Sequence, residues 1–379
     1  LYEILSSCSQ FIRALLSHNS TQGSSLIDLV INKFLSVFFD ITERCLILYK
    51  LKSFYYNFIE SKLKYIKILK FLTIFIFCNK IFLGTMKVIV TGVGGFVGSV
   101  VAEKLSKSHK VFGIYRKRRP NIKETTNLKF IKSNLKRLNN LPTKSDYIFH
   151  AASETPNNSK SNDQIMKSNL TSMKNLIDYS IRSQCKYFLF CSSMSVYGMN
   201  NQKLISEKSK FIKPNQYGLS KIKCEKLLHD ACLENNNLTG LSIRLPGIVG
   251  KNSEKNFLSN VLNKILKNDP IYVYNKNSTF NNIIHIDDIA SFANYWFLKK
   301  NNSYNMFNVA SNRPMTLDSI IKLMMKELNR KVSVKSNFKG KKPFIINTEY
   351  AKKCSFNIRS TKSSLLKFVT DKKNLMRII

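Results

Sequence analysis

From residue 86 onward, short apolar runs alternate with longer stretches in which apolar positions recur at helical spacing. The short runs, rich in Val, Ile, Phe and Leu, occupy 86–90, 110–115, 128–135, 146–153, 186–198 and 241–250. The longer helical patterns occupy 97–107, 162–182 and 217–235. Consecutive apolar residues over so short a span are typical of strands buried on both faces of a parallel sheet. The alternation therefore predicts an α/β fold built on a doubly wound parallel sheet.

Residues 1–85 follow a different pattern, with apolar, helix-prone runs at 26–41 and 67–84 between basic residues. The apolar core of the second run, Phe71 to Cys78, is far shorter than the about 20 residues that span a bilayer. Two interpretations stay open. The segment is either a real extension, which could contact a membrane surface, or upstream sequence that was translated in frame and is not part of the native protein.

Composition and charge narrow the class of protein. The 379 residues are 44% hydrophobic and 11% aromatic, which permits a substantial core. A total of 61 Lys+Arg against 23 Asp+Glu gives a net charge of +38, which could indicate a nucleic-acid or anionic-membrane partner. The lysines are scattered over all predicted elements, and no zinc-finger or RNA-binding motif accompanies them. We therefore interpret the charge as a compositional bias and expect no nucleic-acid partner.

The eight cysteines contain no C-x-x-C pair and no ligand spacing with histidine. Cys185 and Cys191 fall at or within an apolar, strand-like run. This pattern predicts reduced, buried thiols and a cytoplasmic protein.

A glycine-rich turn, TGVGGFVG (91–98), follows the first strand directly and opens a helix. In such a turn the first glycine permits the tight bend, the second lets a pyrophosphate approach, and the third allows the helix to pack on the strand. The anion then lies at the positive end of the helix dipole. The turn predicts a dinucleotide site made by Gly92, Gly95, Phe96, Val97 and Gly98.

The end of the second strand bears on which dinucleotide binds. NAD-preferring sites place Asp or Glu there, whereas this chain has Tyr115 followed by the cations of 116–119. Arg116 would accommodate a 2′-phosphate, so NADP is preferred over NAD as the predicted cofactor.

Other candidates stand where the later strands end, because ligands of open α/β sheets bind at the carboxyl ends of the strands. They are Asn134 and Leu135 after the third strand, Ala151, Ala152 and Ser153 after the fourth, and Ser192 and Ser193 on the fifth. Tyr217 and Lys221 share a helix face at positions i and i+4, and an ammonium beside a phenol favours the phenolate, a stronger base.

Seven motifs together resemble the extended short-chain dehydrogenase/reductase family, in particular the NAD-dependent epimerase/dehydratase group that acts on nucleotide-linked sugars. In family order they are TGVGGFVG (91–98), HAAS (150–153), Asn169, CSSMSVYG (191–198), YGLSK (217–221), RLPGIVG (244–250) and HIDDIA (285–290). The resemblance implies a Rossmann sheet with a smaller C-terminal substrate-binding lobe, a bound NAD or NADP, a nucleotide-sugar substrate and a homodimer.

The resemblance also implies roles for single residues. Tyr217 would exchange a proton with a sugar hydroxyl. Lys221 would lower the pKa of Tyr217 and hold the nicotinamide ribose, and Ser193 would hydrogen-bond the reacting oxygen. Asn169 and Pro246 join the cofactor residues, and Ser153, Ser193 and Asn281 form the implied substrate set.

Two departures from the family pattern limit the reaction. Met194 and Ser195 stand where the dehydratases carry an Asp-Glu pair, so a 4,6-dehydratase is not expected. Asn281 replaces an arginine that clamps the substrate pyrophosphate in epimerases. We interpret His285, Asp287 and Asp288 as residues that link the two lobes, and His150 as a packed strand residue; no metal site is predicted.

The predicted domains are the extension 1–85, a cofactor domain 86–246, and a lobe over 247–379 that returns to the sheet around 283–310. The predicted function is an epimerase. An NADPH-dependent reductase of a ketosugar or other carbonyl is the alternative, and a non-catalytic nucleotide- or RNA-binding protein is a second one.

Overall fold

The computed structural model describes residues 85–156, 161–254, 256–298, 303–337 and 342–376, all within one compact unit, Thr85–Ile379. Both interpretations of the N-terminal segment concern residues that lie outside the described ranges, apart from Thr85. Among the described residues, no helix has the length and apolar character needed to cross a membrane.

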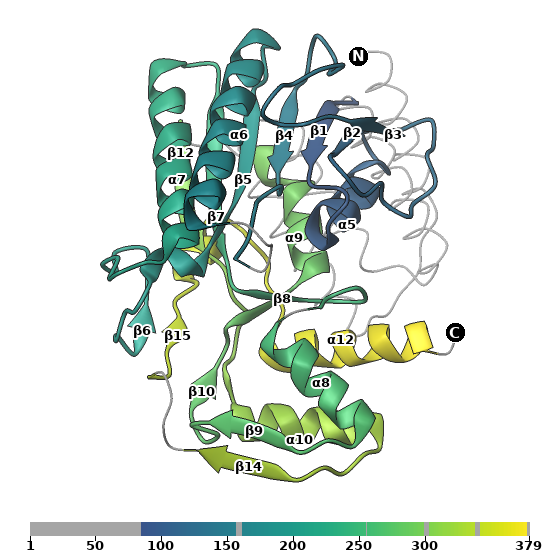
Figure 1. Cartoon of the computed structure of the whole chain (residues 1–379), viewed down its shortest axis with the longest axis vertical. Helices are drawn as coiled ribbons and strands as arrows, with labels where there is room; N and C mark the ends of the chain where they lie inside the picture. Colours follow the sequence, from purple (N-terminus) through teal and green to yellow (C-terminus); the bar gives the residue numbers. More distant parts are fainter. Residues whose placement is uncertain (1–84, 157–160, 255, 299–302, 338–341, 377–379) are drawn as a thin grey trace, which may run out of the picture. The chain divides into compact units, whose positions relative to one another are not determined.

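A seven-stranded parallel sheet forms the centre of this unit, in the order β12-β7-β5-β4-β1-β2-β3 (Figure 1). Its strands are β1 (Lys87–Thr91), β2 (Lys110–Tyr115), β3 (Leu128–Lys132), β4 (Tyr147–His150), β5 (Tyr187–Ser193), β7 (Thr239–Leu245) and β12 (Tyr304–Asn308). Every pairing within it is parallel. The order reverses at β1, which has β2 on one side and β4 on the other, and this is the switch point at which such sheets bind ligands. The predicted doubly wound α/β fold is confirmed.

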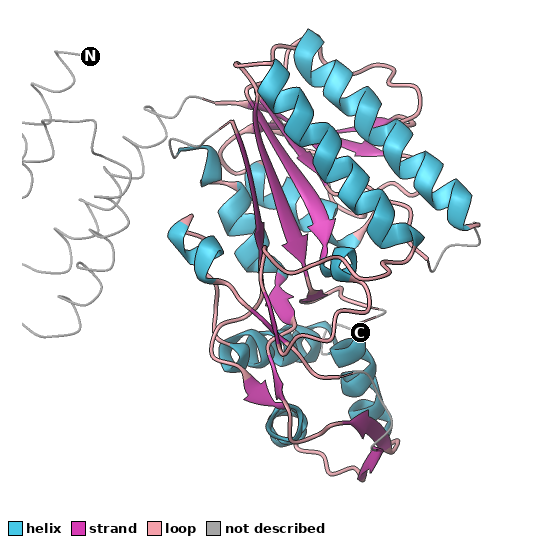
Figure 2. Cartoon of the chain, turned by 90° about the vertical axis from the view of Figure 1, so that its left-hand side faces the viewer, coloured by secondary structure: helices cyan, strands magenta, loops and turns pink. Residues whose placement is uncertain are grey.

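Helices cover both faces of the sheet, as the side view in Figure 2 shows. The helices α5 (Phe96–Leu105) and α9 (Ile286–Ala293) contact each other on one face, and α6 (Asn162–Arg182) and α7 (Gln216–Glu234) do so on the other. The pleat of β1 supplies both layers, since Val88 and Val90 join the core with α5 and α9 while Ile89 joins the core with α6 and α7. Because both faces are buried, the central strands are mostly apolar, and the lysines lie at the start of β1 and β2 and on the edge strand β3.

Four of the predicted strands end before their apolar runs do. The runs 128–135 and 146–153 give β3 and β4, which end at Lys132 and His150, and the other two runs each contain a second element. The run 186–198 becomes β5 followed by a 3₁₀ helix, η1 (Met194–Tyr197). Ser193 is the N-cap of η1, and its hydroxyl accepts from the backbone N–H of Ser195. The run 241–250 divides at Pro246 into β7 and β8 (Gly247–Val249), because proline has no N–H to donate to the ladder.

The remaining elements belong mainly to the C-terminal part of the chain, apart from β6. They are β6 (Leu204–Ile205), α8 (Phe257–Lys267), β9 (Ile271–Tyr274), β10 (Thr279–Phe280), β11 (Ile283–His285), η2 (Trp296–Leu298), β13 (Met315–Thr316), α10 (Leu317–Leu328), β14 (Val334–Asn337), β15 (Ile345–Ile346), α11 (Glu349–Lys353) and α12 (Thr361–Met376). A separate apolar core holds α8, α10 and α12 against the β9–β14 pair. The chain between them returns to the main sheet as β12, so this lobe is built from two segments.

Candidate active site

The glycine turn between β1 and α5 is packed too tightly for side chains. Gly92 has φ +76°, and a Cβ there would lie 2.8 Å from the backbone N of Ala152. A Cβ at Gly98 would lie 2.4 Å from the carbonyl O of Gly92, so α5 touches the turn that precedes it. Glycine is therefore required at both positions by sterics.

The N-terminus of α5 is arranged as an anion site. Gly95 is its exposed N-cap, and among the described residues no side chain caps this end of the helix. The N–H groups of the first turn, which includes Phe96, Val97 and Gly98, have no partners within the helix and lie at the positive end of its dipole. This cradle fits the pyrophosphate of a dinucleotide.

The end of β4 is held close to this turn by a buried hydrogen-bond relay. Thr91 Oγ1 lies 2.7 Å from Nδ1 of His150 and accepts from the backbone N–H of Ala152 at 3.2 Å. Ala151, Ala152 and Ser153 are half-buried beside it. The small side chains thus let the backbone that follows β4 approach the glycine turn.

Arg116, at the end of β2, is paired with a residue that the sequence reasoning missed. Its guanidinium donates to the carboxylate of Glu154, whose side chain is 6% exposed against 43% for Arg116. The arginine predicted to receive a 2′-phosphate is therefore already engaged with an anion.

Two predicted cofactor residues, Asn169 and Asn134, make side-chain hydrogen bonds within the protein, and a third, Leu135, packs against the core. The amide of Asn169 bonds the backbone of Glu154 and donates to Ser220 Oγ at 3.0 Å. Asn134 accepts from the backbone N–H of Lys136 in its own turn, and Leu135 packs in the core beneath α6. Asn169 is thus a buried support between the end of β4 and α7, whereas Asn134 is exposed and only its Oδ1 is engaged in its own turn.

Tyr217 and Lys221 lie on one face of α7, as predicted. The Nζ of Lys221 is 5.5 Å from the centroid of the Tyr217 ring and donates to the carbonyl O of Cys191 on β5 at 2.8 Å. Lys221 is 3% exposed, whereas Tyr217 is partly exposed. The lysine therefore joins α7 to the strand that carries the two candidate serines.

Ser193 is brought next to the start of α7 by a close backbone contact. A Cβ at Gly218 would lie 2.3 Å from the carbonyl O of Ser195, so only glycine after Tyr217 lets the helix reach η1. The hydroxyl of Ser193 lies 3.1 Å from both the backbone N and the Oγ of Ser195. Ser193, Tyr217 and Lys221 thus come from two elements that contact each other at the carboxyl end of β5.

A buried ion pair lies behind these residues. Glu225, one turn beyond Lys221, accepts from Ser192 Oγ at 2.5 Å and from Nε and Nη2 of Arg244 at 2.9 and 2.6 Å. Arg244 also donates to the hydroxyl of Tyr197 at 2.7 Å. The pair connects α7, β5, β7 and η1.

Burial keeps the neighbouring side chains neutral. Burial, assisted by the charge of Lys221, lowers the pKa of His150 to about 3. Burial raises the pKa of the Cys191 thiol to about 12, against the opposing effect of Lys221. His150 is a packed residue, and the cysteines of the described ranges are free thiols: Cys185, Cys191, Cys224, Cys232 and Cys354.

Asn281 lies apart from this cluster. Its amide donates to the carbonyl O of Ile346 at 2.8 Å and accepts from the N–H of the same residue at 2.9 Å, and the side chain is 3% exposed. It pins β15 in place, and both of its amide atoms are engaged with the backbone of β15 at a position that is almost fully buried, so the structure gives no sign of the substrate contact predicted for Asn281. Pro246 is half-buried where β7 gives way to β8.

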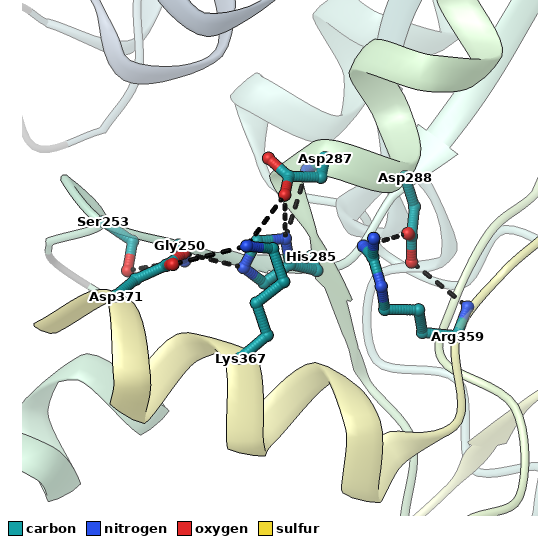
Figure 3. Close-up of polar contacts among 8 residues, drawn as sticks. All are labelled: Gly250, Ser253, His285, Asp287, Asp288, Arg359, Lys367 and Asp371. Atoms are coloured by element: carbon teal, nitrogen blue, oxygen red, sulfur yellow. Dashed lines mark hydrogen bonds and ion pairs between the residues drawn. The ribbon is translucent and has the colours of Figure 1, made fainter. Parts of the chain in front are cut away.

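Polar side chains of the His-x-Asp-Asp segment connect the start of α9 to α12 and to Arg359, which lies just before α12 (Figure 3). His285 is fully buried and lies 3.2 Å from Asp371, while Asp288 accepts from the side chain and backbone of Arg359. Lys367 bridges Asp287 and Asp371 at 3.2 and 3.4 Å. Within the described ranges, no group of three or more His, Cys, Asp or Glu is arranged to hold a metal ion.

Sequence signals for the missed residues were present but weak. Glu225 continues the i, i+4 spacing of Tyr217 and Lys221, and Arg244 opens one of the quoted motifs. Glu154 is an isolated acid after a run of small residues, and only the pairing of β1 with both β2 and β4 brings it near Arg116.

Comparison with known proteins supports this picture. The model of the "NAD dependent epimerase/dehydratase family" matches residues 88–310, which is more than half of the chain and contains every candidate residue named above. An uncharacterized UDP-glucose epimerase of Bacillus subtilis is 31% identical over 162 residues, which are 38% of this chain and 51% of that protein. The match thus spans about half the length of that relative.

Two further relatives are similar over more of their length. ADP-L-glycero-D-manno-heptose-6-epimerase of Brachyspira hyodysenteriae is 26% identical over 271 residues, 65% of this chain and 82% of that protein. The crystal structure of UDP-glucuronic acid 4-epimerase from Bacillus cereus in complex with NAD has a TM-score of 0.67 at 20% identity, covering 76% of this chain and 97% of that one. The structural likeness shows the fold alone, and that neighbour holds NAD, which gives no support to the preference for NADP drawn from Arg116.

Proposed function

Because this chain belongs to the NAD dependent epimerase/dehydratase family, we propose that it inverts one carbon of a nucleotide-linked sugar by reversible hydride transfer. The observation that carries the proposal is that Ser193 ends β5 while Tyr217 and Lys221 lie on α7, which contacts β5 and is bonded to it through Lys221. The glycine turn, two strands away in the same sheet, provides the matching dinucleotide cradle.

A dinucleotide bound in this cradle would supply the acceptor and donor of hydride at the nicotinamide ring. Tyr217 as phenolate takes the proton from the hydroxyl on the reacting carbon while the C–H bond of that carbon breaks. The carbon becomes a carbonyl, and the proton stays on the Tyr217 hydroxyl. When the same carbon is reduced again from its opposite face, the Tyr217 hydroxyl would give its proton back to the oxygen.

The other residues position these groups. Lys221 is fixed by its bond to Cys191 O, so its ammonium stands beside the Tyr217 ring, where it could also hold the ribose of a bound nicotinamide. Ser193 presents its hydroxyl from the end of β5, where it would hydrogen-bond the reacting oxygen. His150 is neutral near pH 7, because burial lowers its pKa to about 3, so it adds no competing charge.

Epimerisation is favoured over the other reactions considered. Met194 and Ser195 carry no acid for elimination, which argues against a dehydratase. The reductase alternative rested on Arg116 as a site for the 2′-phosphate and on Asn281 in place of the clamping arginine. Arg116 is paired with Glu154, which weakens the first of these two grounds. Two of the similar proteins are named as epimerases of nucleotide-linked sugars and a third as a 4,6-dehydratase of such a sugar, so their names support the class of substrate but not epimerisation over elimination.

The test is turnover of a panel of UDP- and ADP-linked sugars, followed by chromatography of the products. An epimerase interconverts two sugar nucleotides with no net change in nicotinamide, and in D₂O the inverted carbon gains no deuterium because its own hydrogen returns. Tyr217→Phe is expected to lower kcat by about 100-fold or more while dinucleotide affinity stays within about threefold.

Tyr295→Phe, at a tyrosine that is 53% exposed, is the matched control and should leave kcat unchanged. Stoichiometric consumption of NADPH with a reduced product would replace the epimerase by a reductase. Steeply salt-dependent RNA binding without turnover would favour the non-catalytic alternative.

A further inference from the structure

A carboxylate from the end of β4 faces the arginine at the end of β2. Glu154 is four residues past β4 and Arg116 is the first residue after β2, and the two strands flank β1 in the sheet. The Arg116 guanidinium donates to Oε1 of Glu154. The pair therefore spans the width of β1, next to the glycine turn.

Glu154 is held firmly in this position. Asn169 Oδ1 accepts from its backbone N–H at 2.8 Å, and Asn169 Nδ2 donates to its carbonyl O at 3.2 Å. Asn169 itself is 7% exposed and donates to Ser220 on α7. An anchored backbone and a 6% exposed side chain leave the carboxylate little freedom to turn away from Arg116.

Both partners border the phosphate cradle. The chain just before Glu154 passes so close to the turn that a Cβ on Gly92 would lie 2.8 Å from Ala152 N. The chain just after Arg116 does the same, since a Cβ on Gly94 would lie 2.3 Å from the carbonyl O of Arg118. In sheets of this topology, the adenosine ribose lies at the end of β2, beside the glycine turn.

We propose that Glu154, held against Arg116, makes this site select a dinucleotide that lacks a 2′-phosphate. The inference rests on the proposed function, because it concerns the cofactor of that same site. A 2′-phosphate carries nearly two negative charges, and it would have to draw Arg116 away from an anchored, buried carboxylate that repels it. A 2′-hydroxyl can donate to that carboxylate. The acid that discriminates thus comes from β4, although the end of β2 offers only cations.

The experiment is calorimetric binding of two redox-inert probes, ADP-ribose and 2′-phospho-ADP-ribose, to the full chain. The wild-type protein is expected to bind ADP-ribose at least about tenfold more tightly. Glu154→Gln keeps the shape of the side chain but removes its charge and loosens its hold on Arg116, so the ratio should shift by about tenfold toward the phosphorylated probe.

Glu124→Gln is the matched control. Glu124 also pairs with an arginine of the same basic run, Arg119, at 2.9 Å, but its carboxylate is 29% exposed and its arginine 57%. It makes the same change in net charge and should leave the ratio at the wild-type value. In the double variant Arg116→Gln/Glu154→Gln, the gain for the phosphorylated probe should disappear, because the freed cation is gone.

An equal ratio in Glu154→Gln and Glu124→Gln, or a wild-type preference for the phosphorylated probe, would overturn the proposal. If Glu154→Gln does not fold, the proposal is tested by the affinity ratio of the two probes in the wild-type protein and in Arg116→Gln. Arg116→Gln keeps the Glu154 carboxylate, so it must still bind ADP-ribose more tightly than the phosphorylated probe. A wild-type protein that binds neither probe would refute the dinucleotide site itself, whereas equal binding of both probes refutes only the selectivity.

Discussion

Replacement of Arg244 by methionine tests whether the buried ion pair behind the active site holds the sheet and α7 together. Arg244 is 2% exposed and Glu225 7%, so neither charge is solvated. The guanidinium makes two hydrogen bonds to Glu225 and one to Tyr197, and methionine makes none of these. The substitution leaves the Glu225 carboxylate buried with only Ser192 as a donor among the described contacts of its side chain.

The expected cost of Arg244→Met is about 3–5 kcal/mol in the free energy of unfolding, because removing one partner strands a buried charge. Adding Glu225→Gln removes that charge and keeps an acceptor for Ser192. The double variant should therefore regain at least about 1.5 kcal/mol relative to Arg244→Met. The gain would show that the cost arises from the unpaired carboxylate and not from the lost side-chain volume.

Urea denaturation measures the free energy of unfolding of both Arg244→Met and the double variant. Trp296 is the only tryptophan and is 4% exposed in the core, so its fluorescence reports unfolding. Arg119→Met is the control: this arginine is 57% exposed in its pair with Glu124, and its loss should cost no more than about 1 kcal/mol. A cost below about 1 kcal/mol for Arg244→Met, or a double variant at the sum of the single costs, would refute the reasoning.

Two further predictions concern the glycine turn and the pH dependence of stability. Gly98→Ala forces a Cβ to within 2.4 Å of Gly92 O and should lower the free energy of unfolding by about 1–3 kcal/mol. Gly95→Ala meets no atom closer than 3.4 Å and should weaken dinucleotide binding while stability stays within about 0.5 kcal/mol; equal stability losses would contradict the steric account. His150 has its pKa lowered from 6.5 to about 3, so the unfolded chain binds more protons in that window and stability falls as the pH falls through it, by at most about 1.4 kcal/mol per pH unit. His150→Gln should flatten this decline in urea titrations between pH 7 and 4, and an unchanged slope would show that His150 is not its source.

Several expectations remain predictions. The homodimer, the cytoplasmic location and the division at residues 85 and 246 rest on the sequence and its resemblance to a family. The roles of Ser193, Tyr217 and Lys221 also rest on that resemblance, although the structure places the three on contacting elements. Turnover and binding measurements on the full chain are needed to test them.

The pattern of apolar residues along the chain was sufficient to predict most strands and helices of the sheet, and the spacing of the glycines was sufficient to predict the turn after β1. Strands buried on both faces must be apolar throughout, so β1 and β2 were visible from composition alone, and α6 was predicted with its observed bounds. The spacing of the glycines reflects contacts within a few residues of the turn, such as that between Gly98 and Gly92. Such short-range sterics leave a mark that a single sequence shows.

Side-chain partners far apart in the chain were decided only by the tertiary structure. Arg116 was predicted to receive a phosphate, yet 38 residues separate it from the Glu154 that it contacts across β1. Asn281 was predicted to contact substrate, but its amide binds the backbone of Ile346, 65 residues away. A charge or an amide takes its role from whichever group the fold brings within hydrogen-bond distance. The sequence of this protein therefore determined its scaffold and the place of its cofactor turn, whereas the packing of β1 between β2 and β4 decided which polar groups remain free for a ligand.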